Sequence, residues 1–231
     1  MANSHSNKMR TLSKIEYEEL LRQSEIIEQD GYGVKVIRMP DGNFLKTFWL
    51  RRVFTSRRIF PEWLRFKQNA AGLHRRKIPT VTVLETLRIP HLNRTAVIYI
   101  PLEGQTIRQL AAAGGISGGL IFRLGKFIAE LHRQGIYFRS LHFGNVLLCP
   151  DGNFGLIDIS NMKTIPWALG FTARRRNFVN LFRYSQDLEV LHRTGIQNFI
   201  DGYLNGAGKR FSGSVNSALT EFKPSGKFQA G

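Results

Sequence analysis

The stretch GIYFRSLHFGNVLLCPDGNFGLIDIS, from Gly135 to Ser160, decides the fold of this chain. Two apolar runs, Asn145 to Leu148 and Phe154 to Ile159, flank a Pro-Asp-Gly-Asn cluster, a pattern typical of two strands joined by a turn. A hairpin with this spacing brings the start of its first strand beside the end of its second, so we expect Asn145 and Asp158 to be neighbours. Their amide and carboxylate oxygens are hard ligands suited to Mg²⁺, which is usually held by one or two protein oxygens together with substrate phosphates.

This stretch resembles the catalytic loop and metal-binding strand of the protein-kinase-like superfamily, whose loop reads H-R-D-L-x-x-x-N and whose metal aspartate opens D-F-G. Arg139, Leu141, Asn145 and Asp158 match the pattern. Ser140 stands where the family has the aspartate that orients the acceptor hydroxyl. The resemblance implies an α+β fold, with a small antiparallel β lobe, a mainly helical lobe and a nucleotide cleft between them, and it implies ATP and Mg²⁺ as cofactors.

Two residues of this loop, Ser140 and His142, leave open whether the chain is an active kinase. Serine is a far weaker base than a carboxylate, so Ser140 forfeits a general-base contribution of roughly 10²- to 10⁴-fold. Phosphoryl transfer depends mostly on positioning and charge neutralisation, so slow turnover is still compatible with this change. Related small-molecule kinases tend to carry histidine at the position of His142, where a neutral imidazole could contact the transferring phosphate or the acceptor, or replace the missing base. An ordinary hairpin, in which Asn145 caps a turn and Asp158 ends a strand, is the alternative.

Candidate nucleotide-binding residues lie upstream. Lys46 interrupts the apolar run NFLKTFWL and needs a counter-charge, because an unpaired buried ammonium is costly. The superfamily pairs such a lysine with a glutamate on the next helix, and Glu62 is the only acid between Lys46 and Glu85. Glu62 directly follows a proline, so it is equally compatible with a first-turn position favoured by the helix dipole. Gly31 and Gly33 lie between two apolar runs and either cover phosphates or simply form a hairpin turn.

Helical patterns complete the N-terminal part. Ser13 and Glu16 form a capping box that opens a short helix, for which we expect Ile15, Leu20 and Leu21 to be buried. A second helix is expected over Glu62 to Leu73.

The segment 101–104, which contains Glu103, shows no periodicity and matches by position the hinge at which kinase-like folds bind adenine through the backbone.

Downstream, further helices are expected. The clearest runs from Leu120 to Gln134 and is stopped by Gly135; His132 on it is expected to be structural. A basic amphipathic helix or pair of helices covers Arg174 to Arg193, and a last helix covers Ile196 to Leu204. The Arg-rich start and the closing FIDGYL resemble the C-terminal helices of the bacterial lipopolysaccharide-core kinases, which phosphorylate heptose or Kdo sugars. This resemblance implies a core sugar hydroxyl as acceptor and work as a peripheral, membrane-associated protein at the cytoplasmic face of the inner membrane.

Composition limits the possible partners and the possible location of the protein. The chain has 231 residues, a single cysteine and a net charge of +16, and ten Lys or Arg lie between Lys46 and Lys77. The charge indicates an anionic partner: a nucleotide, a phosphorylated substrate, an anionic membrane surface or nucleic acid. One cysteine excludes an internal disulfide and a multi-cysteine zinc site and fits a reducing compartment. We expect no signal peptide and no transmembrane segment.

The expected organisation is a flexible N-terminus over 1–12, an N-lobe over 13–101, a helical C-lobe over 102–211 and a mobile tail over 212–231. Three functions fit these patterns. The first is a lipopolysaccharide-core sugar kinase. The second is a pseudokinase that binds nucleotide or a partner in envelope assembly. The third is a nucleic-acid-binding module, based on the interleaved basic and aromatic residues of 51–67, although no nucleic-acid motif accompanies them.

Overall fold

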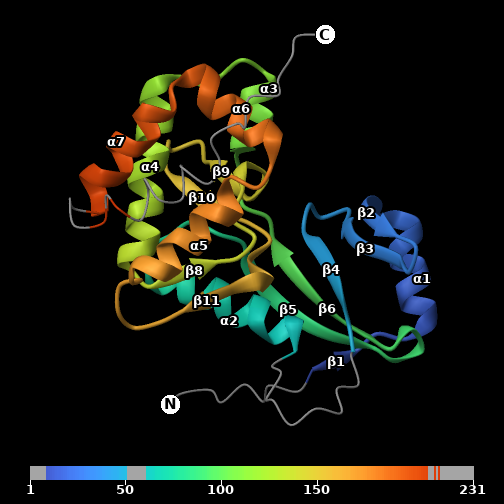
Figure 1. The fold of residues 1–231 in the computed structure, drawn as a ribbon. Coiled ribbons are helices and arrows are strands. Elements are labelled where there is room, and N and C mark those ends of the chain that lie inside the picture. The colour runs from blue at the N-terminus through green and yellow to red at the C-terminus, as the bar shows by residue number, and fades with distance from the viewer. Residues whose placement is uncertain (1–8, 51–60, 208–210, 212, 214–231) are drawn as a thin grey trace. The chain divides into compact units, whose positions relative to one another are not determined.

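The computed structural model describes residues 9–50, 61–207, 211 and 213. The chain divides into two compact units, each described by itself below (Figure 1). The first unit comprises Met1–Ala71 and Thr80–Leu102, and the second comprises Gly72–Pro79 and Glu103–Gly231. A largely antiparallel sheet dominates the first and helices dominate the second, so the α+β class is confirmed. The expected flexible N-terminus over 1–12 lies mostly outside the described residues, as do nearly all of the expected tail over 212–231 and the first ten residues of the basic stretch 51–67.

The first unit is built on a six-stranded sheet with the strand order β1-β5-β6-β4-β3-β2, in which only the β1–β5 pair is parallel. Its elements are β1 (Arg10–Thr11), α1 (Lys14–Gln23), β2 (Glu25–Asp30), β3 (Gly33–Arg38), β4 (Phe44–Trp49), the start of α2 (Glu62–Arg75), β5 (Thr82–Ile89) and β6 (Arg94–Ile100).

Helix α1 packs on one face of this sheet. The expected capping box forms, because the Ser13 hydroxyl accepts from the Glu16 backbone N–H while the Glu16 carboxylate accepts from the Ser13 N–H. The expected buried face is wrong in one respect: Ile15 is 77% exposed, and Tyr17 is buried instead. The helix therefore meets the sheet through the face that carries Tyr17, with Leu20 and Leu21 packed against the same cluster.

The second unit is mainly helical, with two small sheets ordered β10-β9-β7 and β11-β8. Its elements are the last turn of α2, β7 (Gln105–Thr106), α3 (Ile107–Ala112), α4 (Gly118–Arg133), β8 (Ile136–Phe138), β9 (Val146–Leu148), β10 (Phe154–Leu156), β11 (Met162–Thr164), α5 (Phe171–Leu181), α6 (Ser185–Thr194) and α7 (Ile196–Ala207).

Helices α4 and α7 pack closely against each other, and two glycines make this packing possible. A Cβ on Gly202 of α7 would overlap the carbonyl oxygen of Phe122, and a Cβ on Gly125 of α4 would overlap the carbonyl oxygen of Phe199. Only glycine lets two helix backbones approach this closely. The contact fixes α4, whose C-terminal end delivers the chain into the loop at 139–145.

Candidate functional site

The hairpin predicted between Asn145 and Asp158 is present, but its strands are shorter than expected. Val146 pairs with Leu156 and Leu148 with Phe154. Asn145 closes a single 3₁₀ turn that precedes β9. Asp158 lies beyond β10 in a left-handed conformation, with φ 49° and ψ 47°.

The backbone still brings the two ends of the hairpin together, because the Ile157 N–H donates to the Asn145 carbonyl oxygen at 3.1 Å. Asn145 and Asp158 both line one cavity of about 240 Å³. The other lining residues come from the loop after β8 and from the end of α5 and the turn that follows it: Arg139, Ser140, Leu141, His142, Asn180, Arg183 and Tyr184.

The Asn145 side chain is oriented by the loop that precedes it. It is 7% exposed, and its Nδ2 donates to the Ser140 carbonyl oxygen at 2.8 Å. With the amide nitrogen engaged, the amide oxygen is the atom offered to a ligand. This amide oxygen and the Asp158 carboxylate are both hard oxygen donors, which is the chemistry that a Mg²⁺ site requires. Among the described residues no group of three or more His, Cys, Asp or Glu gathers in a geometry suited to a metal ion.

The His142 ring has a defined tautomer. Its Nδ1 accepts a hydrogen bond from the Gly144 backbone N–H at 3.0 Å, so in the neutral ring the proton lies on Nε2. Burial, and then the nearby Arg108 guanidinium, lower the pKa of His142. Its ring also packs edge-to-face against Tyr184, with 4.8 Å between the centroids. In this state Nε2 carries a proton that it can donate, and it has no lone pair with which to take one. This favours contact with a phosphate or acceptor oxygen over the role of a base.

An ion pair between a buried carboxylate and a half-buried guanidinium, both outside the loop, holds this backbone in place. Asp187 of α6 is 1% exposed and accepts from Arg108 Nε at 3.0 Å and from Arg108 Nη2 at 2.9 Å. The same carboxylate accepts from the Phe143 backbone N–H at 3.0 Å. Asp187 therefore ties α3, α6 and the loop together. The sequence analysis missed both residues because nothing local links Arg108 to a carboxylate 79 positions away.

The predicted nucleotide-binding residues other than Glu103 lie in the first unit. Lys46 is half-buried at the centre of β4, opposite Val36 and Val97. Glu62 opens α2 and forms an ion pair with Arg65 at 3.7 Å. Its pairing with Lys46 stays a prediction. Glu103 is exposed in the segment between β6 and β7.

The turn that contains Gly31 is a tight connection between β2 and β3. Asp30 pairs with Gly33, so Gly31 and Tyr32 alone connect β2 to β3. Gly33 has a φ of 114°, which side-chain-bearing residues rarely adopt, whereas Gly31 has no such constraint. Phosphate contact at this turn stays a prediction.

Arg94, which the sequence analysis also missed, anchors this turn. Its side chain is 3% exposed and donates to the carbonyl oxygens of Tyr32 and Val34, the latter at 2.7 Å. The guanidinium also stacks 4.2 Å from the centroid of the Trp49 ring. Arginine can make both kinds of contact at once, because its guanidinium carries several donors for the two carbonyls and is planar, so it also stacks on the ring. The only local indication was a basic residue at the start of the apolar run RTAVIYI.

His132 is structural, as expected. Arg174 donates a hydrogen bond to the Tyr203 hydroxyl at 2.8 Å. The same hydroxyl lies 2.9 Å from His132 Nδ1, and His132 Nε2 lies 3.0 Å from Asn177 Oδ1. Asn177 then donates to the Phe138 carbonyl oxygen at 2.5 Å. Burial lowers the pKa of His132 to about 3 and raises the pKa of Tyr203 to about 12. This chain of hydrogen bonds ends one residue before Arg139 and so supports the loop.

No family model matches the chain, and no curated protein matches it. Among solved structures, the chain is similar to a divergent kinase that lacks the glycine-rich loop and regulates the membrane ultrastructure of the Toxoplasma parasitophorous vacuole. The two are 14% identical with a TM-score of 0.48, and the similarity covers 91% of this chain and 85% of the other. At this TM-score we draw no functional conclusion from the likeness. Within the described residues, every helix is too short or too polar to cross a bilayer.

Proposed function

We propose that the chain is a kinase-like phosphotransferase that uses ATP and Mg²⁺ to phosphorylate a sugar hydroxyl of the lipopolysaccharide core. One observation carries the proposal: the hairpin ends, Asn145 and Asp158, line the same cavity as Ser140 and His142. These four polar residues come from both ends of the hairpin and from the loop that precedes it. Phosphoryl transfer needs such convergence, because its catalysis consists mostly of positioning and charge neutralisation.

Asn145 and Asp158 would hold the Mg²⁺ in this proposal. The Asn145 amide oxygen is presented by the Nδ2 hydrogen bond to the Ser140 carbonyl, and the Asp158 carboxylate supplies the charge. The ion, when bound, neutralises charge on the phosphate oxygens. His142 would donate its Nε2–H to a phosphate or acceptor oxygen, and Arg139 would add positive charge at the same cavity.

ATP would be gripped by residues for which the superfamily resemblance is the main support. Lys46 would contact the phosphates and pair with Glu62, and Gly31 and Gly33 would approach the phosphates through the backbone. Glu103 lies in the segment that would hydrogen-bond to adenine. The extended β4 strand supports the placement of Lys46, since it holds the lysine between two neighbouring strands.

The acceptor would be anionic. Arg139 and Arg183 both line the cavity, and Asp158 is the one acid among the described residues that do so. A core sugar that carries phosphates or carboxylates matches this charge. It would be met at the inner face of the bacterial inner membrane, where a positively charged protein is attracted to anionic lipid.

A second function, nucleotide or partner binding without catalysis, is favoured by a specific observation. The position of the acceptor-orienting aspartate is Ser140, and the tautomer of His142 gives it a donor rather than a base at Nε2. Among the described lining residues, no side chain other than the proposed metal ligand Asp158 supplies a carboxylate to orient the hydroxyl.

A thermal shift assay tests the nucleotide site. We expect ATP with Mg²⁺ to raise the melting temperature, ATP with EDTA to have little effect, and Asp158→Ala to abolish the rise. Asp201→Ala, which removes an exposed acid of α7, is the matched control and is expected to keep the rise. No shift in the wild type under either condition would overturn nucleotide binding.

Phosphate transfer then separates the two functions. The acceptor probe is dephosphorylated core oligosaccharide, with labelled ATP as donor. Incorporation that requires Asn145 and Asp158 supports the kinase. A metal-dependent thermal shift without incorporation supports the binding protein.

A further inference from the structure

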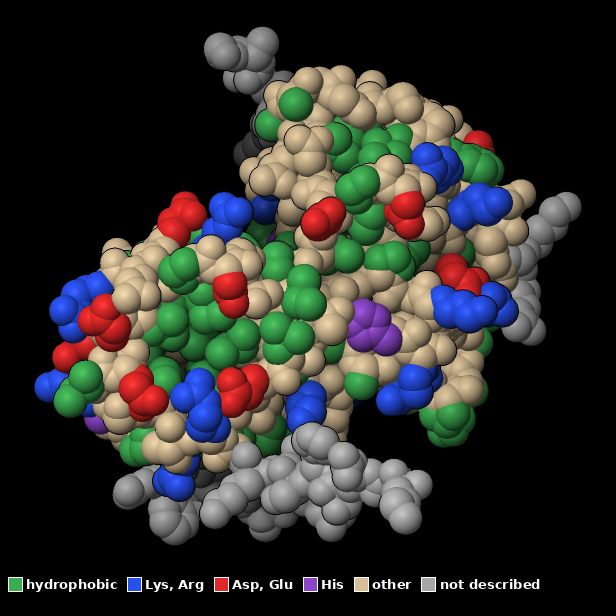
Figure 2. Space-filling view, turned by 180° about the vertical axis from the view of Figure 1, so that it is seen from behind, with side chains coloured by type: hydrophobic (Ala, Val, Ile, Leu, Met, Phe, Trp, Pro, Cys, Tyr) green, Lys and Arg blue, Asp and Glu red, His purple; other side chains and the backbone are tan. Residues whose placement is uncertain are grey.

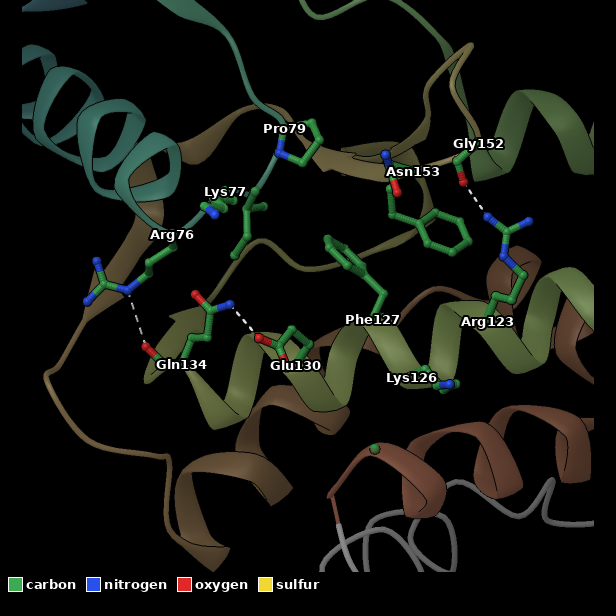
Figure 3. Close-up of a pocket in the computed structure, with 13 residues that line it drawn as sticks. Arg76, Lys77, Pro79, Arg123, Lys126, Phe127, Glu130, Gln134, Gly152 and Asn153 are labelled. Atoms are coloured by element: carbon green, nitrogen blue, oxygen red, sulfur yellow. Dashed lines mark hydrogen bonds between the residues drawn. The ribbon is translucent and has the colours of Figure 1, made fainter.

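A second and larger hollow lies in the second unit, outside the cavity described above (Figure 3). It encloses about 670 Å³ between the segment that follows α2, helix α4 and the turn of the β9–β10 hairpin. We call it the basic groove. Its lining residues are Arg76, Lys77, Ile78, Pro79, Arg123, Lys126, Phe127, Glu130, Gln134, Gly152, Asn153, Phe154 and Gly206.

The charge of the groove is strongly positive. Arg76, Lys77, Arg123 and Lys126 line it, and Glu130 is the only acid among these lining residues. The Glu130 carboxylate is already engaged, because Arg133 donates to it at 2.6 and 2.7 Å and the Gln134 amide also donates to it. The groove therefore holds an excess of cations that Glu130 does not offset.

The four cations divide into two pairs. Arg76 and Arg123 are anchored by the protein: Arg76 donates to the carbonyl oxygens of Gln134 and Gly72, and Arg123 donates to that of Gly152. Lys77 and Lys126 are exposed and have no carboxylate within ion-pair distance among the described residues. These two ammonium groups are thus available to a ligand.

The groove also has an apolar wall. The rings of Phe127 and Phe154 lie 5.4 Å apart, and Ile78 and Pro79 lie beside them on the segment after α2. Figure 3 shows Phe127 of α4 reaching up between the segment with Pro79 and the hairpin turn. A purely inorganic anion would leave this apolar surface uncovered.

Lys77 occupies a position at which lysine is unfavourable for the fold. Its φ is 58°, in the left-handed region. The Ile78 N–H donates to the Leu73 carbonyl at 3.1 Å and the Lys77 N–H to the His74 carbonyl at 2.9 Å, which makes this a Schellman end of α2 with Lys77 at its left-handed position. Glycine or asparagine usually stands there. Such backbone strain is concentrated at functional sites, and Lys77 lines the groove.

We propose that the basic groove binds an acidic segment of a partner protein, with an apolar side chain of that segment on the Phe127–Phe154 wall and flanking carboxylates or phosphates on Lys77 and Lys126. A concave surface with an apolar wall fits a chain segment better than a flat bilayer. The groove lies within the second unit and needs neither nucleotide nor catalysis, so this proposal stands or falls independently of the kinase proposal.

Fluorescence anisotropy of the full chain tests it. The probe is a labelled octapeptide with Leu-Phe at its centre and Asp and Glu on both sides. The test variant is Lys77→Asn with Lys126→Gln, since asparagine accepts the left-handed conformation without the charge. The control is Lys163→Gln with Arg193→Gln, which removes the same charge from two exposed positions on β11 and α6.

We expect the groove variant to bind the peptide about tenfold more weakly and the control variant to stay within about twofold of the wild type. Equal weakening by both variants, or no binding by the wild type, would overturn the proposal. So would groove-dependent binding of a single-stranded oligonucleotide that is tighter than that of the peptide, because the occupant would then be nucleic acid.

Lys77→Gly gives an independent readout. It relieves the left-handed backbone and is expected to raise the melting temperature while it weakens peptide binding. A variant that is more stable and yet binds less cannot owe its loss of binding to unfolding. A raised melting temperature with unchanged peptide affinity would contradict a role for Lys77 in the groove.

Discussion

Ser140 is the residue on which the difference between an enzyme and a binding protein depends. Its backbone carbonyl is already used to orient Asn145, and this contact does not depend on the side chain at 140. The Ser140 side chain is half-buried at the cavity, so a substitution there changes the chemistry offered to the acceptor while the proposed metal ligand is left in place.

We therefore predict that Ser140→Asp keeps or raises phosphate transfer, by up to roughly 10²-fold, because it restores a carboxylate that can orient the acceptor hydroxyl. Incorporation of labelled phosphate into core oligosaccharide measures the effect. Ser140→Ala is the companion variant and separates the hydroxyl from the rest of the site. Complete loss of transfer in Ser140→Asp would show that the serine has a required role of its own.

Helix α4 precedes the loop of the candidate site in the second unit. Its C-terminal end leads toward the loop at 139–145. One face of the helix packs against α7 at Gly125 and Gly202. The contact has no spare room, since a methyl group at either glycine would meet backbone atoms that cannot rotate away. The position of the loop thus depends on the close packing of α4 against α7.

Gly202→Ala is predicted to lower the free energy of unfolding by about 3 kcal/mol, as expected when a methyl group is forced into a packed core. Chemical denaturation measures it. Gly119→Ala, at an open position of α4, serves as the control and is expected to be neutral or to stabilise by up to about 1 kcal/mol. Equal stabilities for Gly202→Ala and the wild type would mean that α4 and α7 do not touch in this way.

The stability of the whole molecule should depend on pH through His132. Burial lowers the pKa of His132 to about 3 in the folded chain, whereas an unfolded histidine titrates near 6.5. Between these values the unfolded state binds a proton that the folded state does not. Unfolding is therefore favoured progressively as the pH falls from about 6.5 toward 3, by up to about 1.4 kcal/mol for each pH unit.

Equilibrium unfolding as a function of pH checks this dependence. His132→Gln is expected to flatten the slope below pH 6.5, even though the variant is less stable throughout. His192→Gln, at an exposed position of α6, is expected to leave the slope unchanged. An unaltered slope in His132→Gln would assign the acid sensitivity to other groups.

The net charge of the whole molecule is +16. On the face in Figure 2, basic and acidic side chains are interspersed. Many acids of the first unit are paired, as between Lys35 and Asp30 at 3.1 Å and between Arg10 and Glu85 at 2.9 Å. In the basic groove, by contrast, Lys77 and Lys126 have no carboxylate within ion-pair distance in the part of the chain that the structure describes.

By itself the sequence determined the local elements. Turn residues between apolar runs were enough to predict the hairpin and hence the convergence of its two ends, and capping residues and helical periodicity were enough to locate α1 and α4. It also indicated that His132 is structural. The hairpin and the two helices depend on residues that are close together in the sequence, so a local pattern contains them. The partners of His132 are not local, because Asn177 and Tyr203 lie 45 and 71 positions away.

Only the tertiary structure decided which distant groups meet. Arg108 and Asp187 are 79 positions apart, Arg94 and Tyr32 are 62 apart, and the basic groove joins four separate segments. The pattern did not decide even the whole buried face of α1, because Ile15 is exposed and Tyr17 is buried once the helix meets the sheet. Buried polar pairs and grooves form where packing brings elements together, and their partners are therefore absent from any local stretch of sequence.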